Sequence, residues 1–172
     1  GLGLTKRLLR ERGDRLVVQH VAARVDQPVL PVAGVGIERD VRDDAEIRKI
    51  GDTYFDIVTP EMLGPGKIAA DFGCGTGRWT KYIHKKVGAV AAIDPSEAIF
   101  VAGQLLKDAG NIHLYKASID NLPFPDEYFD FGFSLGVLHH IPDTPKAMNA
   151  CVRKVKPGGH FLVYLYYNLD NR

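Results

Sequence analysis

The feature that most constrains the fold is a glycine-rich turn at residues 71–77, which reads Asp-Phe-Gly-Cys-Gly-Thr-Gly. The short apolar run before it, residues 67–72, predicts a strand, and residues 76–87 after it suit a helix. Glycines let the backbone turn tightly and let a ligand approach without meeting a Cβ atom. A strand, a glycine turn and a helix in this order predict a nucleotide-binding turn in an open α/β fold.

The same alternation continues through the chain from residue 44 onward. Helical spacing of apolar residues predicts one or two helices over residues 44–63 and further helices over residues 97–108 and 144–155. Apolar runs predict strands at residues 89–93, 112–116, 129–135 and 160–167. Strands that alternate with helices of this length are typical of βαβ units. We therefore expect an α/β fold, a Rossmann-like parallel sheet with helices on both of its faces.

Residues 1–43 differ from the rest because they mix charge with Val, Gly and Pro and show no sustained period. We treat them as an N-terminal extension of unclear role and residues 44–172 as the domain. Within the extension, residues 4–12 and 16–25 are each compatible with a short helix. Its basic residues are interrupted by Glu11 and Asp14, which favours a solvated face over a nucleic-acid contact.

Composition limits the classes of partner. The 172 residues are 45% hydrophobic and 25% charged with a formal net charge of +1, which gives no global reason to expect nucleic acid or an anionic membrane. No apolar run approaches the roughly 18 residues that span a bilayer. Cys74 and Cys151 have neither a metal-binding nor a disulfide spacing, which fits a reducing compartment. With no signal-peptide pattern at the N-terminus, we expect a cytoplasmic protein.

The residues around the turn discriminate between ligands. Dinucleotide enzymes usually space their glycines Gly-x-Gly-x-x-Gly, whereas Gly73, Gly75 and Gly77 follow a tighter spacing. Asp71, two residues before the first glycine, would repel a pyrophosphate and attract the ammonium group of an amino acid. Asp94 closes the second predicted strand 17 residues past Gly77, close to the roughly 20 expected for an acid that binds ribose hydroxyls. An acid at a strand end can also cap the next helix, and that alternative stays open.

Four segments in this order carry a family resemblance. They are residues 71–77 with Asp94, then Leu-Pro-Phe-Pro-Asp-Glu-Tyr-Phe-Asp at 122–130, Leu-Gly-Val-Leu-His-His-Ile-Pro-Asp at 135–143, and Val-Lys-Pro-Gly-Gly at 155–159. Together they resemble the class I S-adenosylmethionine-dependent methyltransferases, in particular those that methylate small molecules such as quinone and sterol precursors. The resemblance covers roughly residues 60–168, and the order and spacing of the segments make it specific.

The resemblance implies a cofactor site for S-adenosylmethionine. Asp71 and the turn would surround the methionyl end of the cofactor, the turn contributing Gly73, Cys74, Gly75, Thr76 and Gly77. Asp94 would hold the ribose diol, and Pro95 and Ser96 would pack near the adenine.

Two later segments would complete that site. An acidic residue often contacts the adenine amine after the third strand of the family, and Ser118 stands at this position here, followed by Ile119 and Asp120. The end of the fourth predicted strand would lie beside the sulfonium, through Ser134, Leu135 and Gly136.

The sequence also offers candidates for catalysis. His139 and His140 follow the fourth predicted strand, and a histidine near the methyl group suits a general base. The alternative is that the pair builds the loop. A metal site is disfavoured because adjacent histidines point in different directions and no third ligand is evident. Three aromatic residues could line an acceptor pocket, although filling the core is the favoured role: Tyr54, Phe55 and Trp79.

We expect a methyltransferase that acts on a small-molecule acceptor. No Asn-Pro-Pro-Tyr or Asp-Pro-Pro-Tyr motif follows the fourth strand, which removes the usual sign of amine methylation on nucleic acid or glutamine. The main alternative is a noncatalytic S-adenosylmethionine-binding domain that acts as a partner or regulator. A dehydrogenase is disfavoured by the glycine spacing and Asp71, and an aminopropyltransferase by the lack of clustered acids for a polyamine.

The resemblance further implies a missing piece, because the family's sheet ends in a strand hairpin beyond the fifth strand and this chain stops soon after it. The run at residues 161–167 is therefore expected at an unprotected sheet edge. Three explanations are open: the chain is a fragment, the N-terminal segment covers the edge, or a second subunit does so in an oligomer. A fragment is the favoured one.

Overall fold

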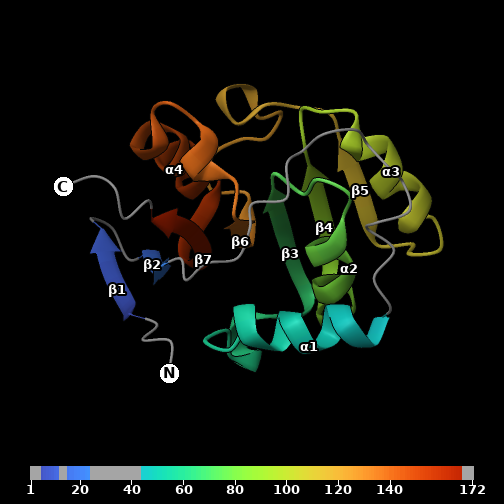
Figure 1. The fold of residues 1–172 in the computed structure, drawn as a ribbon, viewed down its shortest axis with the longest axis horizontal. Coiled ribbons are helices and arrows are strands. Elements are labelled where there is room, and N and C mark those ends of the chain that lie inside the picture. Colours follow the sequence, from blue (N-terminus) through green and yellow to red (C-terminus); the bar gives the residue numbers. More distant parts are fainter. Residues whose placement is uncertain (1–4, 12–14, 24–43, 168–172) are drawn as a thin grey trace.

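The computed structural model describes residues 5–11, 15–23 and 44–167 of the chain. One seven-stranded sheet runs through them in the order β1-β2-β7-β6-β3-β4-β5 (Figure 1). The strands are β1 (Thr5–Glu11), β2 (Arg15–Ala23), β3 (Gly64–Phe72), β4 (Val87–Ile93), β5 (Ile112–Tyr115), β6 (Phe129–Leu135) and β7 (Val155–Tyr167). The strands β3 to β7 are all parallel to their neighbours, which confirms the predicted Rossmann-like sheet.

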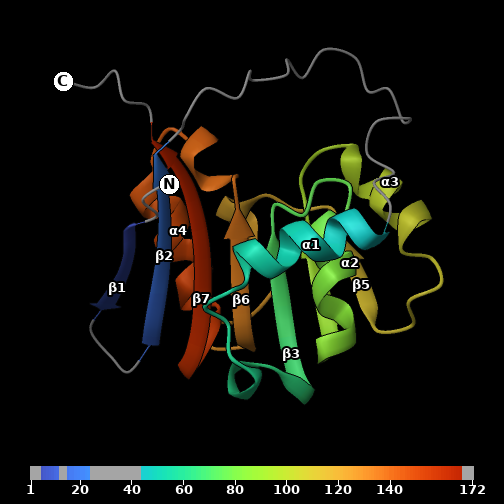
Figure 2. The same ribbon diagram turned by 60° about the horizontal axis from the view of Figure 1, so that its bottom comes forward.

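Helices cover both faces of this sheet, as predicted. They are α1 (Asp44–Tyr54), α2 (Arg78–Ile83), α3 (Ala98–Leu105) and α4 (Thr144–Arg153), with short 3-10 turns at η2 (Pro60–Met62), η3 (His84–Lys86), η4 (Ile119–Asn121) and η5 (Leu138–His140). Figure 2 shows α1 crossing in front of β6 and β3 and α2 on the same side of the sheet, to the right of β3, while α4 lies behind β7. None of the helices in the described ranges is long and apolar enough to cross a membrane.

Two apolar cores lie on opposite faces of the sheet. Alternate residues of a strand point to opposite faces, so Ala69 packs against α1 and α2 with Trp79 and Phe133, while Ala70 and its neighbours pack under α4. Aromatic side chains fill much of both cores, and Phe72, Phe129, Phe131, Phe133 and Phe161 are fully buried. These residues explain why the strands form here, because large apolar side chains pack well on a pleated surface.

The register of the parallel strands brings the predicted site residues to one edge of the sheet. Asp71 of β3 pairs with Ala92 of β4 and with Phe133 of β6. Asp94 directly follows β4, and its backbone N–H donates to the carbonyl of Tyr115 at the end of β5. Ligands of open α/β sheets bind at such carboxyl ends of the strands.

The N-terminal segment corrects two expectations. Residues 5–11 and 15–23 form an antiparallel hairpin of strands, so the predicted short helices over 4–12 and 16–25 are wrong. The second of these strands runs parallel to β7, from Leu16 opposite His160 to Ala23 opposite Tyr167. The expectation that β7 lies at an unprotected edge is therefore also wrong, because the N-terminal segment covers it. Pairing with β7 selects the strand conformation over a local helical preference that was weak.

Candidate ligand site at the carboxyl ends of the strands

The glycine loop between β3 and α2 uses its own backbone donors internally. The N–H groups of Gly73 and Cys74 both donate to the carbonyl of Ile93, over 2.8 and 3.0 Å. The Gly77 N–H donates to the Cys74 carbonyl over 2.9 Å, and the Gly75 N–H donates to Oδ2 of Asp94 over 2.8 Å. A pyrophosphate site needs such N–H groups to point at the ligand. With these four already taken, the loop is poorly suited to a dinucleotide.

The three glycines of the loop serve different purposes. All have positive φ, which favours glycine. A Cβ at Gly73 would lie 2.5 Å from Cγ1 of Val137, and one at Gly77 would lie 2.7 Å from Cδ1 of Leu106, so these two glycines allow close packing. Among the residues that the structure describes, a Cβ at Gly75 would meet nothing within 4 Å. The loop is therefore open above Gly75, which is where a ligand can approach its backbone.

Asp71 is buried at the end of β3, with only 1% of its surface exposed. The hydroxyl of Thr80 in α2 donates to its Oδ2 over 2.6 Å. Burial raises the pKa of Asp71 to about 7, the nearby charge of Asp94 adds to the rise, and the bonds from Thr80 oppose it. The structure thus gives this carboxyl a partner within the protein, and its contact with an ammonium group stays a prediction.

Asp94 holds the loop from the opposite side. Its Oδ2 accepts the hydrogen bond from the Gly75 N–H. Its Oδ1 accepts from the Ser96 N–H over 2.9 Å and from the Ser96 hydroxyl over 2.6 Å. A carboxylate has about four lone-pair sites, so the three internal bonds leave about one site for a hydroxyl of a ligand. The Ser96 hydroxyl also accepts from the N–H of Ala98, the first residue of α3, whose N-cap position is Glu97. The contact with the start of α3 is therefore made by Ser96, and Asp94 is the residue that ties the loop to β4.

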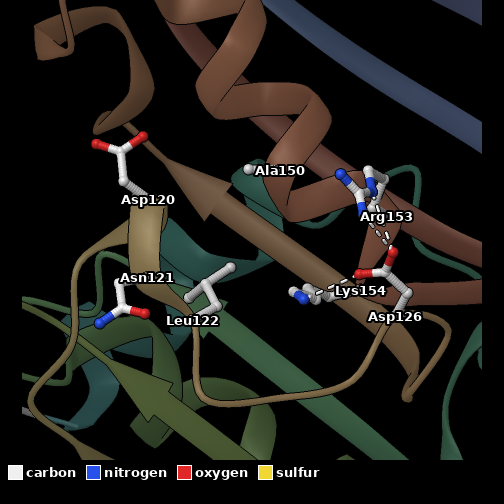
Figure 3. A pocket seen from close by; sticks show the side chains of 7 residues that line it. All are labelled: Asp120, Asn121, Leu122, Asp126, Ala150, Arg153 and Lys154. Carbon is white, nitrogen blue, oxygen red and sulfur yellow. Dashed lines mark hydrogen bonds and ion pairs between the residues drawn. The ribbon is translucent and has the colours of Figure 1, made fainter.

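The predicted adenine contacts follow the ends of β4 and β5, and most of them are exposed. Pro95, Ser96, Ser118 and Asp120 are exposed, whereas Ile119 is buried in the core under α4. Asp120 lines a shallow hollow of about 190 Å³ between η4 and α4 (Figure 3).

The other charges in that hollow neutralise one another. Arg153 and Lys154 both contact Asp126, over 2.6 and 2.9 Å, as the dashed lines in Figure 3 mark. Because its basic residues already have an acidic partner, we assign no ligand to this hollow.

The end of β6 brings three predicted residues to the edge of the site. Ser134 is fully buried, and its hydroxyl donates to the carbonyl of Phe72 over 2.7 Å, so this side chain joins β6 to β3. Leu135 is buried as well. Gly136 has a φ of 74°, and its N–H donates to the carbonyl of Tyr164 in β7. The backbone turns away from the sheet at Gly136, at the same edge as the glycine loop.

The two histidines follow directly in η5. Their ring centroids lie 4.0 Å apart, with His139 half-buried and His140 exposed. Burial lowers the pKa of His139, and the neighbouring His140 lowers it further. Within the described ranges no three His, Cys, Asp or Glu side chains gather as a metal site would require.

The aromatic residues divide between core and surface. Phe55 and Trp79 are buried in the core beneath α1, which supports the core role favoured for them. Tyr54 is half-buried and contacts both Trp79, at a ring-centroid distance of 5.0 Å, and Tyr164, at 4.8 Å. Tyr164 follows Val163 near the end of β7 and pairs with Leu135, so this aromatic contact borders the candidate site.

Sequence reasoning missed two residues that border the loop, both in α2. Thr80 carries the hydrogen bond to Asp71. The Nε of Arg78 is screened from solvent and has no hydrogen-bond partner. The position of each at the start of a helix after a glycine turn was visible in the sequence, but their contacts depend on side-chain directions that a sequence does not show.

Residues 70–163 match the family described as "Methyltransferase domain". The chain belongs to this family. The match runs from the end of β3 to the middle of β7 and so includes both the glycine loop and the turn after β6.

Individual relatives agree with this membership. The methyltransferase domain is 33% identical over 106 residues to the "Ubiquinone/menaquinone biosynthesis C-methyltransferase UbiE" of Vibrio vulnificus, covering 58% of this chain and 41% of that protein. It is 34% identical over 107 residues to the human "Probable tRNA methyltransferase 9B", covering 59% of this chain and 22% of that protein. The chain thus spans less than half the length of each of these two relatives.

A solved structure supports the fold. The crystal structure of a "SAM dependent methyltransferase from Aquifex aeolicus" superposes with a TM-score of 0.51 at 28% sequence identity, covering 67% of this chain and 69% of that one. The residues of the site fit S-adenosylmethionine on three observations. The loop is open above Gly75, its donors are not arranged for a pyrophosphate, and two acidic groups flank it in Asp71 and Asp94.

Proposed function

We propose that this methyltransferase domain binds S-adenosylmethionine and transfers its methyl group to a small-molecule acceptor. The observation that carries the proposal is the glycine loop, which is open to a ligand at Gly75 and held between Asp71 and Asp94. An acid at the end of the second parallel strand suits a ribose diol, and an acid behind the loop suits an ammonium group. S-adenosylmethionine carries both groups.

The cofactor supplies the reactive methyl group on its sulfonium, so the protein need not provide a nucleophile of its own. Its residues have to bind, orient and exclude water. Asp94 and the loop would hold the nucleoside, and the turn at Gly136 would border the reacting end. Ser134 would act through the backbone, because its hydroxyl is already engaged with Phe72.

For the acceptor, we infer an aromatic small molecule. The name of the Vibrio relative places that protein in quinone biosynthesis as a C-methyltransferase. In this chain, Tyr54 and Tyr164 meet edge to face at 4.8 Å next to the candidate site, and half-buried aromatic rings pack well against a planar acceptor. The human relative is named for tRNA. A nucleic-acid acceptor remains disfavoured here by a net charge of +1.

If the acceptor loses a proton during transfer, His139 is the better base of the pair. Its lowered pKa keeps the imidazole neutral near pH 7, and only the neutral ring can accept a proton. His140 is exposed and lowers the pKa of its neighbour. This assignment separates the two histidines that the sequence left equivalent.

A noncatalytic S-adenosylmethionine-binding domain is the second candidate, since the chain spans 41% of the Vibrio relative. Cytoplasmic location stays a prediction from Cys74 and Cys151, which are both free and buried. An oligomer also stays a prediction. With β7 covered by the N-terminal hairpin, the edges that could seat a second copy are β1 and β5.

Calorimetric titration tests the cofactor proposal. S-adenosylhomocysteine should bind to the chain, whereas NAD should not. Tight NAD binding in the absence of S-adenosylhomocysteine binding would overturn it. Transfer of a labelled methyl group to a panel of phenols and quinols then separates an enzyme from a binding domain. Loss of transfer in His139→Gln, with transfer kept in His140→Gln, would assign the base.

A further inference from the structure

The side chain of Arg78, which directly follows the glycine loop, has a buried nitrogen without a hydrogen-bond acceptor. Arg78 is the first residue of α2 and directly follows Gly77. Its side chain is half-buried, and its Nε is shielded from solvent without a hydrogen-bond partner. Buried polar atoms of folded proteins are nearly always paired, and an exception calls for an explanation such as an absent ion or ligand. A guanidinium N–H without an acceptor points to an anion.

The neighbouring cations are already neutralised. In the same helix, Lys81 forms an ion pair with Asp44 over 2.5 Å. Beyond β5, Lys116 pairs with Glu97. Among the residues that the structure describes, Arg78 has no acidic partner, although it is the cation next to the loop. Arg78 is therefore the described cation beside the loop whose charge is left for an anion.

Trp79 fixes the direction in which Arg78 can bind. The guanidinium carbon lies 4.8 Å from the centroid of the Trp79 ring, a cation–π contact that occupies one face of the guanidinium. The N–H groups lie in the guanidinium plane and stay free to donate at its edge. Trp79 is itself held by Tyr54 and Phe55, so the ring provides a firm support. A planar, two-oxygen anion such as a carboxylate suits the free edge.

We propose that Arg78 binds the α-carboxylate of the methionyl group of the cofactor. This inference rests on the proposed function. The methionyl end is a zwitterion. In the proposed function Asp71 would face its ammonium group, and the carboxylate needs a cation close by. Arg78 follows the loop directly, and its guanidinium rests on Trp79, which contacts Tyr54 beside Tyr164 at the border of the candidate site. The pairing also favours ligands that carry the amino-acid end, because Arg78 adds nothing to the affinity of a nucleoside that lacks it.

The test compares two ligands that differ in that end. S-adenosylhomocysteine carries the α-amino and α-carboxyl groups, whereas 5′-methylthioadenosine lacks both and keeps the nucleoside and sulfur. Calorimetry on the full chain gives the Kd of each ligand for the wild type, for Arg78→Met and for Arg78→Lys. Arg153→Met is the matched control, because it removes an arginine whose partner is Asp126 at the distant hollow.

The expected result is selective. Arg78→Met should raise the Kd of S-adenosylhomocysteine by roughly 10- to 100-fold, the range for losing a hydrogen bond to a charged group. The same variant should change the Kd of 5′-methylthioadenosine by less than about twofold. The Kd of S-adenosylhomocysteine for Arg78→Lys should lie between those of the wild type and Arg78→Met, because a lysine keeps the charge and loses the bidentate geometry. Arg153→Met should change neither Kd.

Three results would overturn the inference. An unchanged Kd for S-adenosylhomocysteine in Arg78→Met would show that the arginine does not contact the ligand. An equal loss for both ligands would mean that Arg78 supports the loop or meets the nucleoside. Failure of the wild type to bind either ligand would remove the proposed cofactor and this inference with it. The circular dichroism spectrum and the thermal unfolding midpoint of each variant, matched to the wild type, exclude misfolding as the cause of an equal loss.

Discussion

The hydroxyl of Thr80 donates a 2.6 Å hydrogen bond to Oδ2 of Asp71, and both side chains are buried. One residue ends β3 and the other lies in the first turn of α2, so the bond ties together the two ends of the glycine loop. A buried carboxyl without a partner is costly, and α2 has no side-chain cap from Gly77. The bond thus gives the buried carboxyl a donor and joins the start of α2 to the end of β3.

Thr80→Val should destabilise the protein because it keeps the shape and leaves Asp71 without its hydroxyl donor. The loss in unfolding free energy should be about 1–3 kcal/mol, the cost of an unsatisfied buried polar group. Thr80→Ser keeps the donor and should recover most of that loss. Urea unfolding of the wild type and of the two variants measures these differences in unfolding free energy. Equal stability of the valine and serine variants would show that the methyl group, and not the hydroxyl, matters.

Asp71 should make stability fall as pH rises. Its folded pKa of about 7 lies above the usual value of 3.8. Between about pH 4 and pH 7 the unfolded carboxyl loses its proton while the folded one keeps it, so the stabilisation is complete below about pH 4 and is lost as pH rises through about 7.

The variant Asp71→Asn isolates this effect. An asparagine can still accept from Thr80 but does not titrate. The unfolding free energy of the wild type minus that of the variant should therefore decline from pH 4.5 to pH 7.5, as measured by urea unfolding at each pH. A difference that stays constant across the range would mean that Asp71 is not perturbed.

Two glycines of the loop, Gly73 and Gly75, should respond differently to alanine. Gly75→Ala should cost about 1–2 kcal/mol for the left-handed backbone and weaken S-adenosylhomocysteine binding, because its Cβ enters the open space above the loop. Gly73→Ala adds a clash with Val137 and should cost more stability. Gly110→Ala is the control, since its Cβ also meets nothing within 4 Å but lies after α3. Thermal unfolding and calorimetry separate the two effects. Unaltered ligand affinity in Gly75→Ala would place the ligand elsewhere.

Asp94→Asn should weaken both S-adenosylhomocysteine and 5′-methylthioadenosine, because both carry the ribose diol. The amide presents one acceptor oxygen in place of two, and the Asp94 side chain already accepts three hydrogen bonds. We expect an increase in Kd of roughly tenfold or more, consistent with losing a hydrogen bond to a charged group. Asp126→Asn, at the distant hollow, should leave both Kd values unchanged. A loss of affinity confined to S-adenosylhomocysteine would show that Asp94 contacts the amino-acid end of the ligand and not its ribose.

How much of the fold the sequence predicts depends on whether the signal is local. The strands β3, β4 and β6 are short apolar runs next to turn residues, and the glycine turn marks where β3 ends, so these elements were predictable. The N-terminal hairpin was not. Its strand at residues 15–23 gains its stability from pairing with β7, at the opposite end of the chain, and no local pattern reports such a partner.

The site shows the same division. Asp71 and Asp94 were predicted because they flank a recognisable turn. Their hydrogen bonds were not, since the bond from Thr80 to Asp71 and the bond from Gly75 to Asp94 depend on where α2 and the loop pack. The orphaned Nε of Arg78 could only be found once the surrounding side chains were placed.

The N-terminal hairpin gives a further prediction, which also tests the proposed boundary between residues 43 and 44. Removing residues 1–43 takes β2 away from β7 and leaves the backbone donors and acceptors of residues 160–167 without their partners on that side. Exposed strand edges of this length promote association between copies. The shortened chain should therefore be less stable to urea than the full chain and should form larger species in size-exclusion chromatography with light scattering. A monomer with the same unfolding free energy would instead show that residues 44–172 fold independently, and that the hairpin is an appendage to a complete domain.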